Sequence, residues 1–241
     1  MLTINEPVFS SLFEVHNRSP WALTYSFESV LEKHHAAETH KLLFSHKTDI
    51  LSNLSPQEKN YITSLITRAI LSTDMALHGS LIEDFQRHVA REFPFDKENI
   101  NDRKFLVSFV LHCAGNLLLF QSPVLLKLFV LISACLLIDI GAQTQDISIA
   151  MKWTKCVNDE FMKQVAREKE RDLPLTDYMT GLESPAKRYK SQVGFIAGLV
   201  LPLWGAIAAF FPSLQAAVNR CIENETHYQD RFNELDAVML A

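Results

Sequence analysis

The feature that most constrains this chain is a long apolar run near its middle, residues 117–138, in which Lys127 is the only charged side chain. A membrane-spanning helix needs roughly 20 mostly apolar residues, so this run has nearly the length of one. A second uncharged stretch, residues 192–211, contains three glycines and a proline. A helix that is apolar all round also fits the centre of a soluble helical domain, and we expect that role for the second stretch.

Outside these runs the composition is that of a globular helical protein. Hydrophobic residues make up 48% and charged residues 21% of the chain, which is too apolar for intrinsic disorder. Seven glycines in 241 residues and long stretches of good helix formers predict an all-α fold. The formal charge of −5 argues against a nucleic-acid partner.

The cysteines and the amino terminus predict a cytoplasmic location. The four cysteines are scattered, without a CxxC spacing, which is typical of buried thiols in a reducing compartment. The first residues, MLTINEP, lack the basic and long apolar segments of a signal peptide. Membrane association is left open only through residues 115–138.

Several helix starts follow from local signals. Ser55, Pro56 and Glu58 form a capping box with proline at the first helical position. Ser29 and Glu32 indicate a second capping box. Further helices are expected to begin at Asn101 or Asp102, at Ile149, at Ser184-Pro185 and at Ser213.

Short motifs in a fixed order resemble the catalytic domain of class I cyclic-nucleotide phosphodiesterases. They are residues 28–35 (ESVLEKHH), 71–78 (LSTDMALH), 152–154 (KWT), 159–161 (DEF), 168–170 (EKE), 191–196 (SQVGFI) and 202–204 (PLW). One such fragment is weak evidence, but together they run from about Asn5 to Tyr228, interrupted only at residues 115–138. The resemblance implies an all-α, multi-helical phosphodiesterase catalytic domain of the HD type. Residues 1–241 are expected to be its carboxy-terminal two-thirds, truncated at the amino terminus.

The resemblance also suggests an origin for the apolar run. In the family a helix bearing HCA continues directly as HCAD, whose aspartate is a metal ligand. Here Ala114 is followed by residues 115–138 and only then by Asp139, so that removing the block restores HCAD. We interpret residues 115–138 as a foreign hydrophobic insertion, most simply a translated in-frame intron, which a spliced transcript would test. The alternative is a membrane anchor, which would place the two halves of one core on opposite sides of a bilayer.

The resemblance implies a metal centre that this chain holds only in part. Family members bind two divalent ions, zinc and magnesium or manganese, through two histidines and two aspartates, and use another histidine as general acid. Asp139 alone matches one of these ligands, because the remaining motifs precede the ESVLENHH segment. A catalytic zinc needs about three protein ligands. We therefore expect the 241-residue chain not to retain the metals and to be inactive by itself, with no complete set of catalytic residues.

Further site residues are implied by the same motifs. Glu32, Thr73 and Asp74 correspond to residues around the family's metal site, where carboxylates orient ligands and metal-bound water. Without the other ligands, Glu32 and Asp74 are expected to serve as caps and exposed polar groups. His78 and His112 are expected to be structural polar residues near the site.

The substrate pocket is implied by a separate group of positions. They are the purine-reading Gln192, the stacking Phe195, the apolar Val157 on the other side of that clamp, and Trp153 in the pocket wall. Ala142 replaces a common base-binding asparagine and Ala150 a common tyrosine, so that the choice between cAMP and cGMP stays open.

These observations predict a fragment of a phosphodiesterase that hydrolyses cAMP and/or cGMP to the 5′-nucleotide in signal transduction. Its expected partner is a cyclic nucleotide, with no nucleic acid, and a homodimer is compatible with the sequence. Two alternatives stay open: a non-catalytic homologue that binds a nucleotide or a partner, and a membrane protein with two spans.

Overall fold

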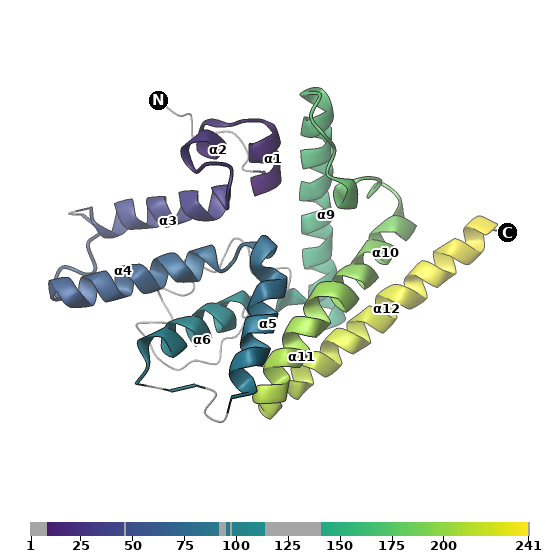
Figure 1. The fold of residues 1–241 in the computed structure, drawn as a ribbon. Coiled ribbons are helices and arrows are strands. Elements are labelled where there is room, and N and C mark those ends of the chain that lie inside the picture. Colours follow the sequence, from purple (N-terminus) through teal and green to yellow (C-terminus); the bar gives the residue numbers. More distant parts are fainter. Residues whose placement is uncertain (1–8, 46, 92–94, 97, 114–140, 241) are drawn as a thin grey trace. The chain divides into compact units, whose positions relative to one another are not determined.

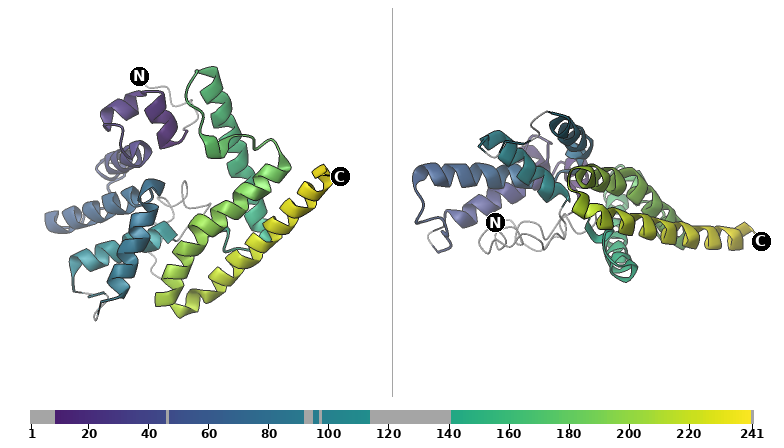
Figure 2. Two further views of the ribbon diagram at one scale, coloured as in Figure 1. Left: turned by 45° about the vertical axis from the view of Figure 1, so that its right-hand side comes forward. Right: turned by 90° about the horizontal axis from the view of Figure 1, so that it is seen from below.

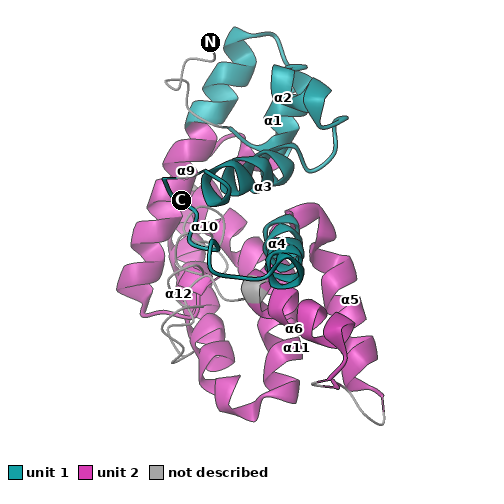
Figure 3. Cartoon of the chain, turned by 90° about the vertical axis from the view of Figure 1, so that its left-hand side faces the viewer, with its two compact units in different colours: residues 1–71, 163–177 teal, residues 72–162, 178–241 magenta. Residues whose placement is uncertain are grey.

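The computed structural model describes residues 9–45, 47–91, 95–96, 98–113 and 141–240. All regular secondary structure in these ranges is helical (Figure 1), which confirms the predicted all-α class. The predictions for residues 115–138 and for Asp139 lie outside the described residues. Two compact units divide the chain (Figure 3): residues 1–71 with 163–177, and residues 72–162 with 178–241.

The first unit consists of short helices and two longer ones. Its elements are α1 (Ser11–His16), α2 (Pro20–Thr24), α3 (Val30–Leu43), α4 (Pro56–Leu71) and the end of α9 (Ile147–Glu170). Serine caps begin both short helices, because the hydroxyls of Ser10 and Ser19 each accept a backbone N–H at 3.2 Å. The longer helices α3 and α4 pack along each other.

The predicted helix starts are partly confirmed. Ser55 and Glu58 form the expected capping box: the Ser55 N–H donates to the Glu58 carboxylate at 2.8 Å, and the Glu58 N–H donates to Ser55 Oγ at 3.3 Å. The helix expected at Ser29 does begin there, as α3, but the serine half of the expected capping box is missing. Ser29 has a left-handed backbone with φ of 43° and makes no side-chain cap. At α6 (Ile100–Cys113), Asn99 Oδ1 accepts the N–H of Asn101 at 2.9 Å, so the cap lies before the predicted residues.

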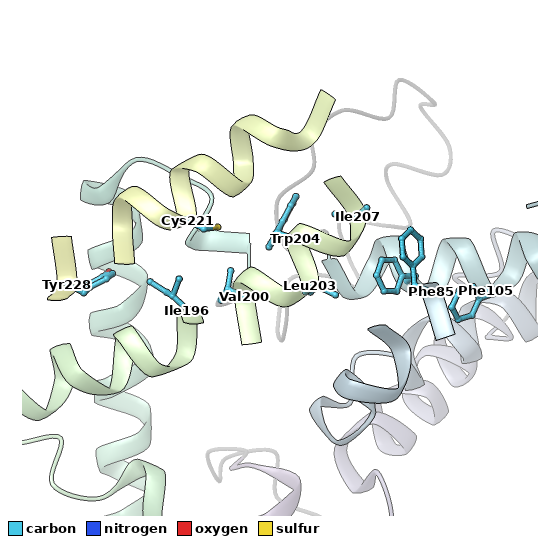
Figure 4. Packing of buried hydrophobic residues seen from close by; sticks show 10 residues of the cluster. Phe85, Phe105, Ile196, Val200, Leu203, Trp204, Ile207, Cys221 and Tyr228 are labelled. Atoms are coloured by element: carbon cyan, nitrogen blue, oxygen red, sulfur yellow. The ribbon is translucent and has the colours of Figure 1, made fainter. Parts of the chain in front are cut away.

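The second unit is built around an aromatic core. Its elements are η1 (Met75–Leu77), α5 (His78–Val89), α6, the first part of α9, η2 (Asp177–Met179), α10 (Pro185–Phe195), η3 (Ile196–Val200), α11 (Leu201–Phe210), η4 (Pro212–Leu214) and α12 (Gln215–Leu240). Figure 4 shows part of the core, where Phe85 lies near Phe105. The rings of Phe85 and Phe109 stack with centroids 3.9 Å apart and planes 7° apart. Trp204, Cys221 and Tyr228 belong to the same core.

The second uncharged stretch forms one nearly continuous helical segment, α10–η3–α11, which α12 accompanies (Figures 1 and 2). A π-helical turn, η3, joins α10 to α11. Pro202 follows this turn and has no N–H to donate, which accounts for a local change of hydrogen-bond register. By length and composition residues 185–210 could cross a membrane, and 33% of their most apolar window is buried. Burial on all sides, expected from the sequence, is therefore not found; one face packs against the core and the other carries small exposed residues.

Candidate functional site

The four predicted pocket residues lie on two helices of the second unit. Trp153 and Val157 are four residues apart on α9, and Gln192 and Phe195 are three apart on α10, so each pair shares one helix face. All four side chains are half-buried. Half-buried polar and aromatic groups on shared faces are suited to contact a ligand while remaining packed.

Tyr228 of α12 contacts both of these helices. Its hydroxyl lies 3.1 Å from Thr154 Oγ1 on α9, next to Trp153. Its ring centroid lies 6.2 Å from that of Tyr189 on α10. Burial raises the pKa of Tyr228, so that it stays a neutral phenol that can donate to Thr154 or accept from it.

The segment that follows Asp139 in the sequence is anchored to α12 as well. Asn224 Nδ2 donates to the backbone oxygens of Gln143 and Gln145 at 2.8 and 2.9 Å. Gln143 Nε2 in turn reaches Thr154 Oγ1 at 3.4 Å. Ala142 is fully buried (0% exposed) in this segment and offers no polar side chain, as its type requires.

Within the part of the chain that the structure describes, the Gln192 side chain makes no hydrogen bond. An amide carries both a donor and an acceptor, so both functions of Gln192 are available to a ligand. Phe195, one turn further on, packs against the edge of the aromatic core, which fixes its ring.

The three residues predicted around the metal site are divided between the two units, Thr73 and Asp74 in the second and Glu32 in the first. Asp74 accepts the Ala76 N–H at 2.8 Å and caps η1, as expected. Thr73, the residue before Asp74, is buried. Glu32 belongs to the first unit and is only 4% exposed. The expectation of an exposed Glu32 is therefore wrong, because Ser11 Oγ donates to its carboxylate at 3.1 Å and α1 covers it.

The described residues do not form a metal centre. Across residues 9–113 and 141–240, with the gaps given above, no three His, Cys, Asp or Glu side chains are grouped so that they could hold an ion. Asp139, the one ligand that the sequence predicted, lies outside the described residues.

Two buried histidines form a contact that the sequence reasoning missed. His78 Nδ1 lies 2.9 Å from His112 Nε2, and their outer nitrogens contact backbone carbonyls at 2.7 and 3.1 Å. Burial lowers the pKa of both rings, that of His112 to about 4. The two residues are 34 positions apart, so no local spacing signals the contact, although each lies in a motif already singled out.

The fold agrees with that of solved phosphodiesterase domains. The phosphodiesterase domain of the RhoPDE fusion protein from the choanoflagellate Salpingoeca rosetta superposes with a TM-score of 0.78 at 23% identity, over 95% of this chain and 65% of that chain. LmjPDEB1, solved in complex with IBMX, gives a TM-score of 0.76 at 20% identity, over 94% of this chain and 61% of that chain. At these identities the likeness establishes the fold.

The chain belongs to the 3′,5′-cyclic nucleotide phosphodiesterase family, whose profile matches residues 4–221. A probable 3′,5′-cyclic-AMP phosphodiesterase, pde-4 of Caenorhabditis elegans, is 28% identical over 96% of this chain and 31% of its own length. Isoform F of the Drosophila melanogaster 3′,5′-cyclic-AMP phosphodiesterase is 28% identical over 94% of this chain and 31% of its own length. The chain thus spans about a third of the length of these relatives. The family is metal-dependent.

Proposed function

We propose that this chain forms the nucleotide-binding part of a cyclic-nucleotide phosphodiesterase catalytic domain, and that the whole enzyme hydrolyses cAMP and/or cGMP to the 5′-nucleotide. The family match over residues 4–221 supports the proposal, as do the relatives named as cyclic-AMP phosphodiesterases. The observation that carries it is the unengaged Gln192 amide, one helical turn from Phe195 on the same face of α10.

These two side chains provide what a purine needs. The Gln192 amide can donate to one atom of a purine edge and accept from its neighbour. The Phe195 ring offers an apolar face on which the base can stack. Trp153 and Val157 on α9 would supply the apolar wall opposite. Because the amide can be turned to present either group first, the proposal covers both adenine and guanine.

Hydrolysis calls for more than this chain's described residues. The family's zinc and magnesium or manganese ions would supply a nucleophile and neutralise phosphate charge, and of the ligands only Asp139 is present in the sequence. We therefore expect the 241-residue polypeptide to bind nucleotide without turning it over.

A binding titration with fluorescent cAMP and cGMP analogues tests base recognition. Gln192→Ala should weaken binding about tenfold, from the loss of one or two hydrogen bonds worth about 1 kcal/mol each. Phe195→Ala should weaken it by a similar factor through lost stacking. Gln86→Ala, at an exposed position of α5, is the matched control. Equal affinity of Gln192→Ala and Gln86→Ala would contradict the assignment of the purine site.

A turnover assay separates the enzyme from its alternatives. Measurable hydrolysis by the purified chain that disappears in Asp139→Ala would overturn the expected inactivity. Transcripts that add the HNxxHA and HDxDHxG motifs upstream would select the enzyme. Nucleotide binding without turnover from a verified start at Met1 would select a non-catalytic homologue. The cytoplasmic location, the homodimer and the lack of a nucleic-acid partner stay predictions.

A further inference from the structure

The contact between His78 and His112, here called the histidine pair, lies at a junction of the second unit. His78 is the first residue of α5, and His112 lies in the last turn of α6. His78 Nε2 contacts the Leu199 carbonyl at 3.1 Å, inside the π-helical turn that follows Phe195. His112 Nδ1 contacts the Ser72 carbonyl at 2.7 Å, just before Thr73 and Asp74.

The three contacts need more hydrogens than two neutral rings carry. A carbonyl oxygen only accepts, so His78 Nε2 and His112 Nδ1 must both be protonated to bond the two carbonyls. The facing nitrogens, 2.9 Å apart, need a third hydrogen between them. Each neutral imidazole has one N–H. The row carbonyl–imidazole–imidazole–carbonyl is therefore complete only when the pair holds one additional proton.

The surroundings oppose that proton. His112 is 1% and His78 5% exposed, and burial lowers both pKa values. Asp74 is the one other ionisable side chain, among those described, whose charge acts on the pair, and it partly offsets the effect at His112. Residues 191–211 contain no ionisable side chain, and the nearest charges along the other two helices are Glu83 on α5 and Lys104 on α6.

The helix ends decide where a charge would reside. The positive end of the α5 dipole lies at His78 and disfavours a cation there, whereas the negative end of α6 lies at His112 and favours one. At neutral pH the pair therefore carries two ring hydrogens for three contacts.

We propose that the histidine pair is a proton-dependent latch, which in its neutral form holds either the Ser72 or the Leu199 carbonyl and in its protonated form holds both. In one neutral arrangement His112 donates to Ser72 and His78 donates to His112, and the pair then supplies no hydrogen to the Leu199 carbonyl. In the other, His78 donates to Leu199 and His112 donates to His78, and the pair then supplies no hydrogen to the Ser72 carbonyl. The shorter Ser72 contact, 2.7 against 3.1 Å, favours the first arrangement.

The latch connects two parts of the unit that carry predicted site residues. Leu199 follows Phe195 by one turn in the segment that bears Gln192. Acidification would then fasten that turn to α5, and neutral pH would release it. His78 and His112 act here as positioning residues, which touch backbone rather than any ligand.

Nitrogen-15 NMR of the histidine rings in the full 241-residue chain tests the latch directly. At pH 8 we expect both rings to carry Nδ1–H, the arrangement that keeps Ser72. As the pH falls from 7 to 3, the pair should take up one proton in total. Nε2–H on both rings, the arrangement that keeps Leu199, would also support the latch. Facing lone pairs at pH 8, with Nδ1–H on His112 and Nε2–H on His78, would overturn it, as would uptake of two protons over that range.

A variant tests the hydrogen count independently. In His112→Gln a neutral amide brings two N–H groups, so that with the one of His78 all three contacts have a hydrogen without an added proton. Amide hydrogen exchange in residues 199–204 should depend on pH, after correction for intrinsic exchange rates, in the wild-type chain and not in His112→Gln. His227→Gln, a partly buried histidine of α12, is the control and should keep the wild-type dependence. If this corrected exchange is independent of pH in the wild-type chain, the latch is wrong.

Discussion

Glu168 offers a sharp test of how the first unit holds together. Its carboxylate is fully buried, at 0% exposed, and accepts three hydrogen bonds: from the Thr176 N–H at 2.9 Å, from Thr176 Oγ1 at 2.7 Å and from Gln164 Nε2 at 2.9 Å. Gln164 also accepts the Ser10 N–H at 3.0 Å. One carboxylate thus joins the end of α9 to the loop after it and, through Gln164, to the start of α1.

Replacing Glu168 by glutamine keeps the shape and removes one acceptor. Hydrogen bonds to a charged group contribute about 1.5–3 kcal/mol each. In Glu168→Gln the new amide NH2 would face one of the present donors, so one such bond is lost. The free energy of unfolding should therefore fall by about 2 kcal/mol. Glu168→Ala leaves all three donors without their acceptor and should lower it by about 4 kcal/mol.

The pH dependence of the same variant has a definite sign. Burial by itself raises the pKa of Glu168, but the bonds from Thr176 and Gln164 outweigh it, so the pKa is lowered from 4.5. A carboxyl whose folded pKa is depressed stabilises the fold above its unfolded pKa, and this contribution is lost as the pH falls through the folded value. The difference between wild type and Glu168→Gln should therefore shrink below about pH 4.5.

Urea unfolding followed by circular dichroism, at pH 7 and at steps down to pH 3, measures both effects. The control is Glu170→Gln on the same helix, whose exposed ion pair with Arg167 spans 2.8 Å. An exposed pair contributes less than about 1 kcal/mol. If Glu168→Gln destabilises no more than Glu170→Gln at pH 7, the carboxylate does not hold the unit as described.

Three further predictions concern packing, capping and thiol reactivity. Phe109→Ala should cost about 3–5 kcal/mol of unfolding free energy, because its ring stacks on Phe85 in the core; a loss under about 1 kcal/mol in thermal or urea unfolding would refute that packing. Ser55→Ala should lower the free energy of unfolding by about 1 kcal/mol through the lost cap of α4. An unchanged midpoint of urea unfolding, followed by the circular dichroism of the helices, would contradict this. Burial raises the pKa of Cys221 to about 12, whereas Cys156 is exposed; alkylation at pH 8 with peptide mapping should modify Cys156 faster than Cys221, and equal rates at these two residues would refute the burial.

Local chemistry made part of this fold predictable. The signals at Ser55 and Ser184-Pro185 needed only neighbouring residues, and helices begin there as expected. The helix predicted at Ser29 also begins there, but the Ser29 side chain makes no cap bond, and Ser11 Oγ accepts the Leu31 N–H at 3.1 Å instead. At this position the sequence pattern predicts the helix start correctly, while the acceptor for the helix N–H comes from a tertiary contact that the pattern does not show.

In the candidate site, too, local sequence predicts some features and misses those that depend on tertiary contacts. The helix predicted around Gln192 is found as α10, and Gln192 and Phe195, three residues apart, share one of its faces; their role in a pocket stays a prediction. The histidine pair and the Glu168 cluster were out of reach, because each joins segments that meet only after folding. Buried polar groups of this kind must find partners, but the sequence shows only the groups and not their partners.

The position of Gln192 therefore depends on residues that never touch a ligand. The ring of Tyr228 on α12 lies near that of Tyr189 on α10, and its hydroxyl is within hydrogen-bond distance of Thr154 Oγ1 on α9. Beyond α10, Pro202 has no N–H to donate, and the Leu199 carbonyl lies 3.1 Å from His78 Nε2. A substitution at Tyr228 or His78 should thus change nucleotide affinity through the placement of α10, whereas one at Gln192 should change it through the base. Comparing the two kinds of variant with adenine and guanine nucleotides separates these causes, because only loss of the amide should alter the ratio of the two affinities.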